Sequence, residues 1–408
     1  MKTLDNGSVT SPRGFRATGV TAGLKASGKP DMALVVSDQP AVFAAAFTQN
    51  LFAAPPVQYC RDLAGRVKRL RALLINSGNA NACTGRKGLS DAARMARLTA
   101  DGLGVAADEV MVFSTGRIGV PLPMPKIEAG IRTATSQLTA DGGLAAATAI
   151  MTTDTKCKSL AVELDVGGVP VRVGGMAKGA GMIAPNMAVV APHATLLACV
   201  TTDAVLADGL LAECFSEATE QSFNRISVDG DTSTNDSFLA LANGAAGNLA
   251  IRPGTLEADH FRAALRHVAG ELARQLVLDG EGATKFVHVH VTGARTVEQA
   301  RRAAMAVANS LLCKTAWFGG DPNWGRILDA AGYSGVELTP GAISLDYDAV
   351  PVVRAGVDAG TSEDKLAAVL KQREFHLHLN LGAGEAQFTA WTCDLSYEYV
   401  KINAEYHT

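Results

Sequence analysis

Strand-like and helix-like segments alternate along the whole 408-residue chain, and this alternation constrains the fold more than any other feature. No long low-complexity linker and no internal repeat interrupts it. Short apolar runs predict half-buried strands at 33–36, 72–75 and 109–113. Apolar residues at three- and four-residue spacing predict helices at 91–103, 203–222 with Asp203 as N-cap, 256–276 and 297–312.

Two pairs of strand-like segments flank glycine turns and predict hairpins. Segments 159–164 and 169–173 are joined through Gly167-Gly168, and 375–381 is joined to 386–393 through Gly382-Ala-Gly384. Hairpins mixed with helices argue against a doubly wound parallel sheet. We therefore expect an α+β protein, a layered α/β sandwich with mixed sheets.

The composition favours a soluble enzyme that acts on small molecules. A net charge of -3 supplies no broad field for nucleic acid or an acidic membrane. Seven cysteines without a CxxC pair predict reduced thiols in the cytoplasm. The first 14 residues lack the apolar core of a secretory signal, and no segment has the uninterrupted apolar length of a membrane helix.

Two neighbouring segments suggest chemistry. Lys178 lies among glycines in 174–185, where backbone amides and an ammonium could converge on a small anion; a glycine-rich turn with an exposed lysine is the equal alternative. Downstream, Ala194-Thr195 opens an apolar run. A threonine there permits self-cleavage, after which the freed α-amine, with a pKa of about 7.7 to 8.0, activates the hydroxyl. An ordinary strand threonine is the simpler interpretation of these residues alone.

Other polar segments are less specific. Backbone amides at Thr115 and Gly116, in the turn 114–119, could face an oxyanion, although an ordinary strand-to-loop turn is the preferred interpretation of these residues alone. The acidic segment 229–236 lacks EF-hand spacing, which favours packing and capping roles.

Two histidine pairs alternate with apolar residues. His288-Val-His290 and His376-Leu-His378 each place two imidazoles on one strand face. No third ligand is evident near either pair in the sequence, so we predict solvated strand positions and no metal site.

Eight segments in order resemble the ornithine acetyltransferase family, and together they cover nearly the whole chain. They are Asn76–Gly85, Ser114–Gly119, Ile150–Asp154, the Lys178 segment, Asp231–Asp236, Lys314-Thr-Ala, Asp321–Arg326 and the tail Asn403–Thr408.

The resemblance implies N-terminal-nucleophile-like autoprocessing between Ala194 and Thr195. Residues 1–194 form an alpha chain with the oxyanion and substrate segments, and residues 195–408 form a beta chain whose C-terminal α/β region closes the site. The chains remain associated, typically as an α2β2 heterotetramer. By implication, N2-acetyl-L-ornithine acetylates Thr195, and L-glutamate then accepts the acetyl group in arginine biosynthesis. No cofactor is implied, although some members also use acetyl-CoA as donor.

The resemblance also assigns roles to single residues. Thr115 and Gly116 form the oxyanion hole beside the nucleophile Thr195. The residues that bind substrate are Thr152, Lys178, Thr195, Glu281, Asn403 and Thr408. Lys178 suits an α-carboxylate and Glu281 suits an ammonium group.

One departure from the family pattern lies beside the scissile bond. The family has Pro-Asn-Met-Ala-Thr, whereas Pro185-Asn-Met-Ala188 is followed here by five further residues, Val189 to His193, before Ala194-Thr195. Catalytic geometry tolerates only small misplacement. Two alternatives therefore stay open: an autoprocessed amidase or aminopeptidase that uses water as acceptor, and an uncleaved, non-catalytic relative.

Overall fold

A computed structural model describes residues 1–185, 188–189 and 196–405. The chain forms two compact units. Of the described residues, unit 1 comprises Met1–Asn224 and Thr232–Leu276, and unit 2 comprises Arg225–Asp231 and 277–405. The expected cleavage point, Ala194–Thr195, lies outside the described residues and within the sequence span of unit 1.

Unit 1 is built on a mixed sheet of ten described strands, ordered β1-β6-β7-β9-β11-β3-β4-β5, with β2 and β8 paired to β3. β4 and β5 are parallel, as are β9 and β11, whereas the other pairs are antiparallel. The strands are β1 Lys2–Thr3, β2 Phe15–Val20, β3 Met32–Phe47, β4 Arg69–Asn79, β5 Val110–Arg117, β6 Lys158–Val166, β7 Val169–Lys178, β8 Ala188–Val189, β9 Leu197–Thr202 and β11 Ser237–Ala242.

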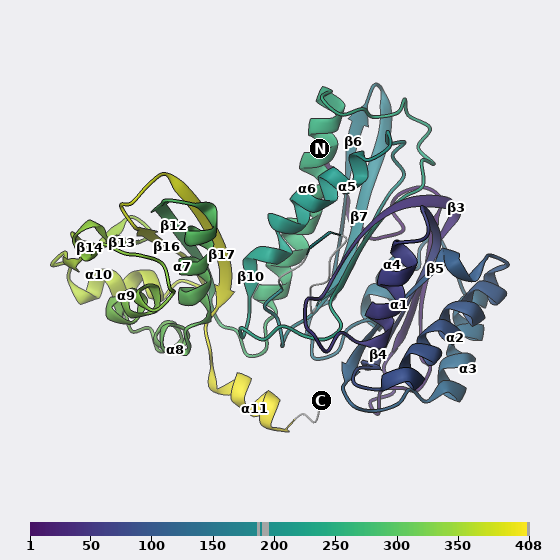
Figure 1. Ribbon diagram of the computed structural model, residues 1–408, viewed down its shortest axis with the longest axis horizontal. Coiled ribbons are helices and arrows are strands. Elements are labelled where there is room, and N and C mark those ends of the chain that lie inside the picture. Colours follow the sequence, from purple (N-terminus) through teal and green to yellow (C-terminus); the bar gives the residue numbers. More distant parts are fainter. Residues whose placement is uncertain (186–187, 190–195, 406–408) are drawn as a thin grey trace. The chain divides into compact units, whose positions relative to one another are not determined.

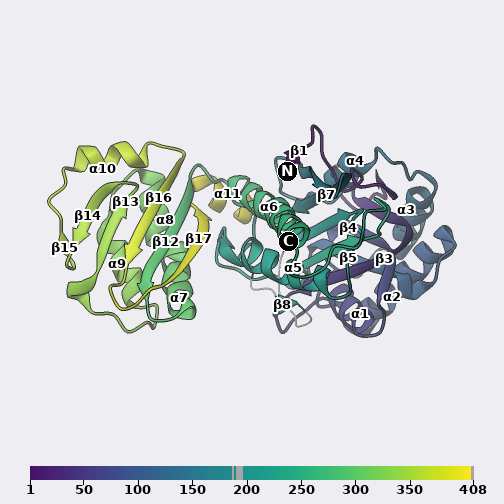
Figure 2. The same ribbon diagram turned by 90° about the horizontal axis from the view of Figure 1, so that it is seen from above.

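Helices cover both faces of this sheet (Figures 1 and 2). On one face, the apolar core joins α1 to α4 with strand residues such as Leu73 and Leu239. On the other face, Phe238 packs on Phe215 of α5, with ring centroids 4.4 Å apart. A Cβ at Gly175 would lie 2.8 Å from Val268, so this glycine lets α6 approach β7. The helices are α1 Pro55–Ala64, α2 Gly85–Leu103, α3 Met124–Ser136, α4 Gly143–Ala149, α5 Leu210–Glu220 and α6 Leu256–Leu278.

Unit 2 has its own mixed sheet of seven described strands, ordered β10-β17-β12-β16-β13-β14-β15. Alternate residues of β12, such as Val287 and Val289, are fully buried in a core shared with Ala300 and Ala304 of α7. The elements are β10 Ile226–Ser227, β12 Phe286–Ala294, α7 Val297–Asn309, α8 Leu311–Gly319, α9 Trp324–Gly332, β13 Ser344–Tyr347, β14 Val350–Arg354, β15 Val357–Asp358, α10 Glu363–Leu370, β16 Glu374–Asn380, β17 Ala386–Cys393 and α11 Tyr397–Glu405. The 3-10 helices of the described chain are η1 Ala107–Glu109, η2 Phe223–Arg225 and η3 Pro340–Ala342.

The expected α+β class with mixed sheets is confirmed, as is the β6–β7 hairpin. Three predicted helices had wrong boundaries. α2 begins at Gly85, six residues before the expected start at 91. α5 begins at Leu210 after the left-handed Gly209, because Asp203 instead accepts backbone hydrogen bonds from Arg13 and Arg172, at 3.0 and 2.7 Å, and caps no helix. The segment 297–312 is divided between α7 and α8, because extended Ser310 ends α7 and accepts a hydrogen bond from the N–H of Cys313.

The expected closing hairpin is also wrong, since β12 lies between its two strands (Figure 2). β16 pairs with β12 in parallel and β17 pairs with it antiparallel. The connecting turn crosses the end of β12, where Ala383 and Gly384 donate backbone hydrogen bonds to Gly293. A Cβ at Gly293 would lie 2.2 Å from the Asn380 side chain, so glycine is needed at this crossing. Because β12 lies between β16 and β17, it has a hydrogen-bonded neighbour on each side.

All seven cysteines are free thiols, as expected, and five of them are buried. Among the described residues, no helix has both the length and the apolar character that a membrane span requires.

Candidate active site

Lys178 lies at the end of β7 and is only 5% exposed, which excludes the interpretation of an exposed lysine on a turn. Its ammonium group donates to Oγ1 of Thr115 at 3.2 Å. Nearby, Oδ1 of Asp154 accepts from Nζ of Lys158 at 2.7 Å and from the N–H of Gly179 at 2.7 Å. Burial alone raises the pKa of Asp154, but Lys178, Lys158 and the hydrogen bonds outweigh it and lower the pKa to about 2. Asp154 therefore stays ionised at neutral pH.

Thr152 is tied to the same carboxylate. Its backbone N–H donates to Oδ2 of Asp154 at 2.9 Å, and its side chain is half-buried. Of three residues that the family resemblance assigned to the site, Lys178 and Thr152 thus lie beside Asp154, and Thr115 is connected through its hydrogen bond with Lys178.

The end of β5 requires glycine, and it includes the first residues of the turn expected at 114–119, because Ser114 to Arg117 belong to the strand. Gly116 has a φ of +127°, and a Cβ there would lie 2.5 Å from the carbonyl carbon of Gly78 on β4. The neighbouring Ser114 hydroxyl donates to the Asn76 side chain at 2.7 Å, which ties the end of β5 to β4. The two strand ends therefore hold the candidate oxyanion segment in one conformation.

The segment Thr232–Ser237 holds both flanks of the expected cleavage region. The Thr232 hydroxyl donates to the Ala184 carbonyl at 2.9 Å, and the Ser237 N–H donates to the Leu196 carbonyl at 2.7 Å. The Asn235 amide donates to the Ser114 carbonyl at 2.8 Å, so the same segment is fixed to the oxyanion turn. Packing and capping roles were expected for the segment 229–236, and the side-chain hydrogen bond of Asn235 is of this kind.

Ala194 and Thr195 themselves lie outside the described residues. Of the five added residues, Val189 ends β8, which pairs with β3 at Ala46, and 190–193 lie outside the described residues. The predicted roles of Ala194 and Thr195 therefore stay predictions.

Asp236 was not identified from the sequence as a buried carboxyl group near Lys178. Its side chain is fully buried, and neither carboxylate oxygen has a hydrogen-bond partner among the described residues. Burial raises the pKa of Asp236 well above its usual range, and Lys178 only partly opposes this. Its acidic segment was noticed in the sequence, but the burial of one carboxyl group depends on tertiary packing.

Lys25 is a second missed cation, and no sequence motif marked it. Its ammonium group donates to the Pro30 carbonyl at 2.6 Å. Burial lowers the pKa of Lys25 to about 8; Asp31 opposes the shift and Lys178 adds to it. Two mutually repelling ammonium groups close to one carboxylate suit the binding of an anionic ligand.

Unit 2 brings together two of the predicted substrate residues. Nδ2 of Asn403 in α11 donates to Oε2 of Glu281 at 2.7 Å, and Glu281 is only 9% exposed. Gly282, at a φ of +68°, lets α11 approach this turn, because a Cβ there would lie 2.6 Å from the N–H nitrogen of Tyr399. The predicted residue Thr408 lies outside the described residues.

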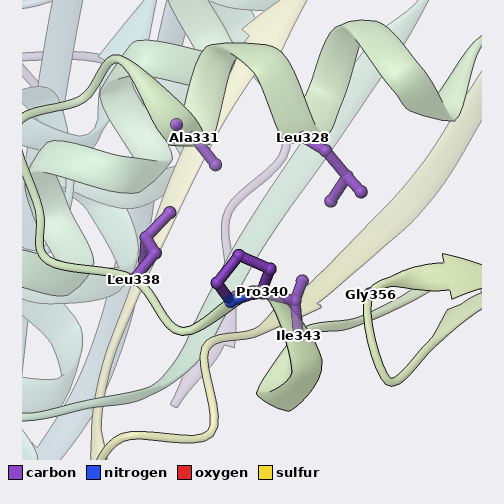
Figure 3. A pocket seen from close by; sticks show the side chains of 7 residues that line it. Leu328, Ala331, Leu338, Pro340, Ile343 and Gly356 are labelled. Carbon is purple, nitrogen blue, oxygen red and sulfur yellow. The ribbon is translucent and has the colours of Figure 1, made fainter.

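An apolar pocket of about 200 Å³ also lies in unit 2 (Figure 3). None of the residues predicted to bind substrate lines it. Its apolar walls do not suit a zwitterionic amino acid. They are formed by Leu328, Ala331, Gly332, Leu338, Pro340, Ile343 and Gly356.

The two histidine pairs do not lie apart, contrary to the expectation. His288 pairs with His376, and His290 with His378, across β12 and β16. His288, His290 and His376 are half-buried rather than fully solvated. Burial and the neighbouring imidazoles lower the pKa of His290 to about 4.

Comparison with known proteins identifies relatives over the full length. The sequence model of the ArgJ family matches residues 16–408. An arginine biosynthesis bifunctional protein ArgJ from Symbiobacterium thermophilum is 50% identical, covering 98% of this chain and 99% of that protein. The protein of the same name from Caldanaerobacter subterraneus is 46% identical, with 100% of both chains covered.

Among solved structures, an ornithine acetyltransferase from Mycobacterium tuberculosis in complex with ornithine is 44% identical. The alignment covers 46% of this chain and 99% of that chain, with a TM-score of 0.43.

Proposed function

Because the chain belongs to the ArgJ family, we propose that it is a glutamate N-acetyltransferase of arginine biosynthesis, which takes the acetyl group from N2-acetyl-L-ornithine. The match of the family over residues 16–408 carries this proposal. The buried cluster of Lys178, Thr115 and Asp154 supports it, because an ammonium group near hydroxyl groups suits an amino-acid carboxylate.

The proposed reaction has two steps through an ester on Thr195. The chain first cleaves itself between Ala194 and Thr195, which frees the α-amine of Thr195 to act as the base. The Thr195 hydroxyl then attacks the acetyl carbonyl, the C–N bond of acetylornithine breaks, and the transferred proton leaves with ornithine. The α-amine of glutamate attacks the ester, the C–O bond breaks, and N-acetylglutamate leaves.

The residues of unit 1 supply charge stabilisation in this scheme. Thr115 and Gly116 stabilise the oxyanion, in the conformation that the close approach of Gly78 enforces. Lys178 binds the substrate α-carboxylate, and Thr152 lies beside it through Asp154. Asp154 remains ionised and thereby holds the lysines in place.

The family pattern also assigns Glu281 and Asn403 to substrate binding. Glu281 binds the side-chain ammonium of the ornithine moiety, and the Asn403 amide orients its carboxylate by the 2.7 Å hydrogen bond. Thr408 completes this part of the site, in accordance with the family pattern.

Further parts of the proposal concern assembly and donors. We propose that the two cleaved chains associate as α2β2 and act in the cytoplasm, where the seven free thiols are compatible with a reducing compartment. No cofactor is required for either step. Acetyl-CoA is proposed as a second donor, since the full-length relatives are named bifunctional.

The deciding experiment supplies the purified protein with N2-acetyl-L-ornithine, with and without L-glutamate, and measures N-acetylglutamate, ornithine and acetate. We expect N-acetylglutamate and ornithine in equal amounts and little acetate. Acetate as the main product would instead support the amidase, and no turnover would support a non-catalytic relative. Replacing acetylornithine by acetyl-CoA tests the second donor. Lys365→Met, an exposed lysine on α10, serves as the control for substitutions of Lys178.

A further inference from the structure

Four histidines gather on one face of the unit 2 sheet. β12 and β16 are neighbouring strands (Figure 2). They pair in parallel, so His288 lies opposite His376 and His290 lies opposite His378. The intervening residues, Val289 and Leu377, are fully buried in the core on the opposite face. The strand register therefore forms the cluster from residues about 90 positions apart in the sequence.

The ring nitrogens of three of these histidines converge. One ligand nitrogen from each of His288, His290 and His376 lies within 4.8 Å of the others. Nε2 of His290 and Nδ1 of His376 are separated by 2.8 Å. The rings are nearly parallel, with centroids 4.1 Å apart for His288 and His376. Three convergent imidazoles are the donor set that divalent zinc, nickel and copper prefer.

We propose that His288, His290 and His376 bind one divalent transition-metal ion of the zinc class on this face of unit 2. The proposal is independent of acetyl transfer, since none of the three residues belongs to the proposed acyl-transfer machinery.

The outer partners resemble those of metal-binding histidines. Nε2 of His288 donates to the Glu374 carboxylate at 2.9 Å, and Nδ1 of His290 lies 2.9 Å from the Thr389 hydroxyl. Such contacts fix the orientation of a ligand ring and select its tautomer. His290 therefore directs Nε2, the opposite nitrogen, toward His376.

Coordination requires a modest adjustment. In a tetrahedral site with zinc about 2.0 to 2.1 Å from each histidine nitrogen, two ligand nitrogens are about 3.4 Å apart. The 2.8 Å pair, Nε2 of His290 and Nδ1 of His376, must therefore separate by about 0.6 Å, and a pair up to 4.8 Å apart must approach by up to about 1.4 Å, which rotation of the half-exposed imidazole rings can supply. A water molecule can occupy the fourth position, as in other three-histidine zinc sites.

The test uses the full chain, treated with a chelator and dialysed, and titrated with Zn²⁺ against a chromophoric indicator at neutral pH. We expect one ion per chain, and we expect His290→Ala and His376→Ala each to weaken binding by more than about 100-fold, because loss of an outer partner alone costs about 10- to 100-fold. Glu374→Gln should weaken binding by about 10-fold. His260→Ala, an exposed histidine on α6, is the control and should leave affinity unchanged.

A second measurement separates loss of ligands from loss of folding. Saturating Zn²⁺ should raise the melting temperature of the wild type and of His260→Ala, but not that of His290→Ala or His376→Ala, while the metal-free variants keep the wild-type circular dichroism spectrum. Zn²⁺ binding that is equally tight in the wild type and in the His290→Ala and His376→Ala variants would overturn the proposal. The proposal would also be overturned if the wild-type protein bound no Zn²⁺ in competition with the indicator, so that the indicator stayed saturated throughout the titration.

Discussion

The Lys178 cluster of unit 1 and the histidine cluster of unit 2 both contain titratable groups removed from solvent, but the charges of the neighbouring groups differ. Around Lys178, the neighbouring lysines lower the pKa of the buried Asp154 to about 2. In the histidine cluster, burial and the neighbouring imidazoles lower the pKa of His290 to about 4. An ionic cluster suits a charged amino acid, whereas neutral imidazoles suit a metal ion. Titratable residues thus acquire their chemistry from burial and from the sign of their neighbours.

The largest effect on stability is expected from a substitution in the Lys178 cluster. Asp154→Asn leaves the ammonium of Lys158, which is 1% exposed, without its carboxylate partner. We expect a loss of about 3 to 5 kcal/mol of unfolding free energy at pH 7, measured by urea denaturation. The exposed pair Arg66–Asp62 is the matched control, and Asp62→Asn should cost about 1 kcal/mol or less. Equal losses in the two variants would contradict the ionic description.

The same substitution has a pH signature. The pKa of Asp154 is about 2 in the folded protein, below the usual value of about 3.9 for an unfolded chain. Its stabilising contribution is therefore present above about pH 4 and is lost as the pH falls through about 2. We expect the stability difference between wild type and Asp154→Asn to shrink toward pH 2.

Lys178→Met removes the buried ammonium group and keeps most of the apolar stem. Truncation of one partner of a buried charge pair costs about 2 to 5 kcal/mol, so kcat/KM for acetylornithine should fall by about 100-fold or more. Steady-state kinetics provide the measurement, with Lys365→Met as control. Activity of Lys178→Met within about twofold of wild type would show that Lys178 does not bind the substrate.

Glu281→Gln tests the recognition of the substrate ammonium. The substitution removes the charge, and its amide oxygen can still accept from Asn403. Because a hydrogen bond to a charged group contributes about 1.5 kcal/mol or more, KM for acetylornithine should rise about 10-fold. We expect little change in KM for acetyl-CoA, which lacks that ammonium, and an equal rise for both donors would contradict the assignment.

Asp236→Asn should have the smallest effect on stability. Burial raises the pKa of Asp236, so the folded protein favours the protonated form, and this group opposes folding increasingly as the pH rises above its unfolded pKa. Asparagine is neutral and nearly isosteric. We expect an unfolding free energy at pH 7 within about 1 kcal/mol of wild type, or above it. Destabilisation of several kcal/mol in the urea transition would show that Asp236 is ionised and paired.

The sequence predicted the local parts of both units. Periodicity located β4, β6, β7 and α6, and the family resemblance selected Lys178, Thr115 and Thr152, which the structure then joined around Asp154. Periodicity alone left Lys178 undecided between an anion site and an exposed turn, since burial is a property of the assembled sheet.

Features that depend on non-local pairing were not predictable. The turn at 382–384 looked like a hairpin because a local pattern carries no information about a strand inserted between its arms. The same inserted strand brings His288 beside His376, so the wrong hairpin and the missed histidine cluster have one cause. Asp236 was missed because the desolvation of a carboxyl group requires elements that are distant in sequence.

The most direct test of the proposed mechanism is intact-mass analysis with N-terminal sequencing of the purified full-length product. We expect two chains, residues 1–194 and 195–408, the second of which begins with Thr195. A single intact chain of 42.3 kDa, or a second chain that begins at any other residue, would contradict Thr195 as the self-generated nucleophile.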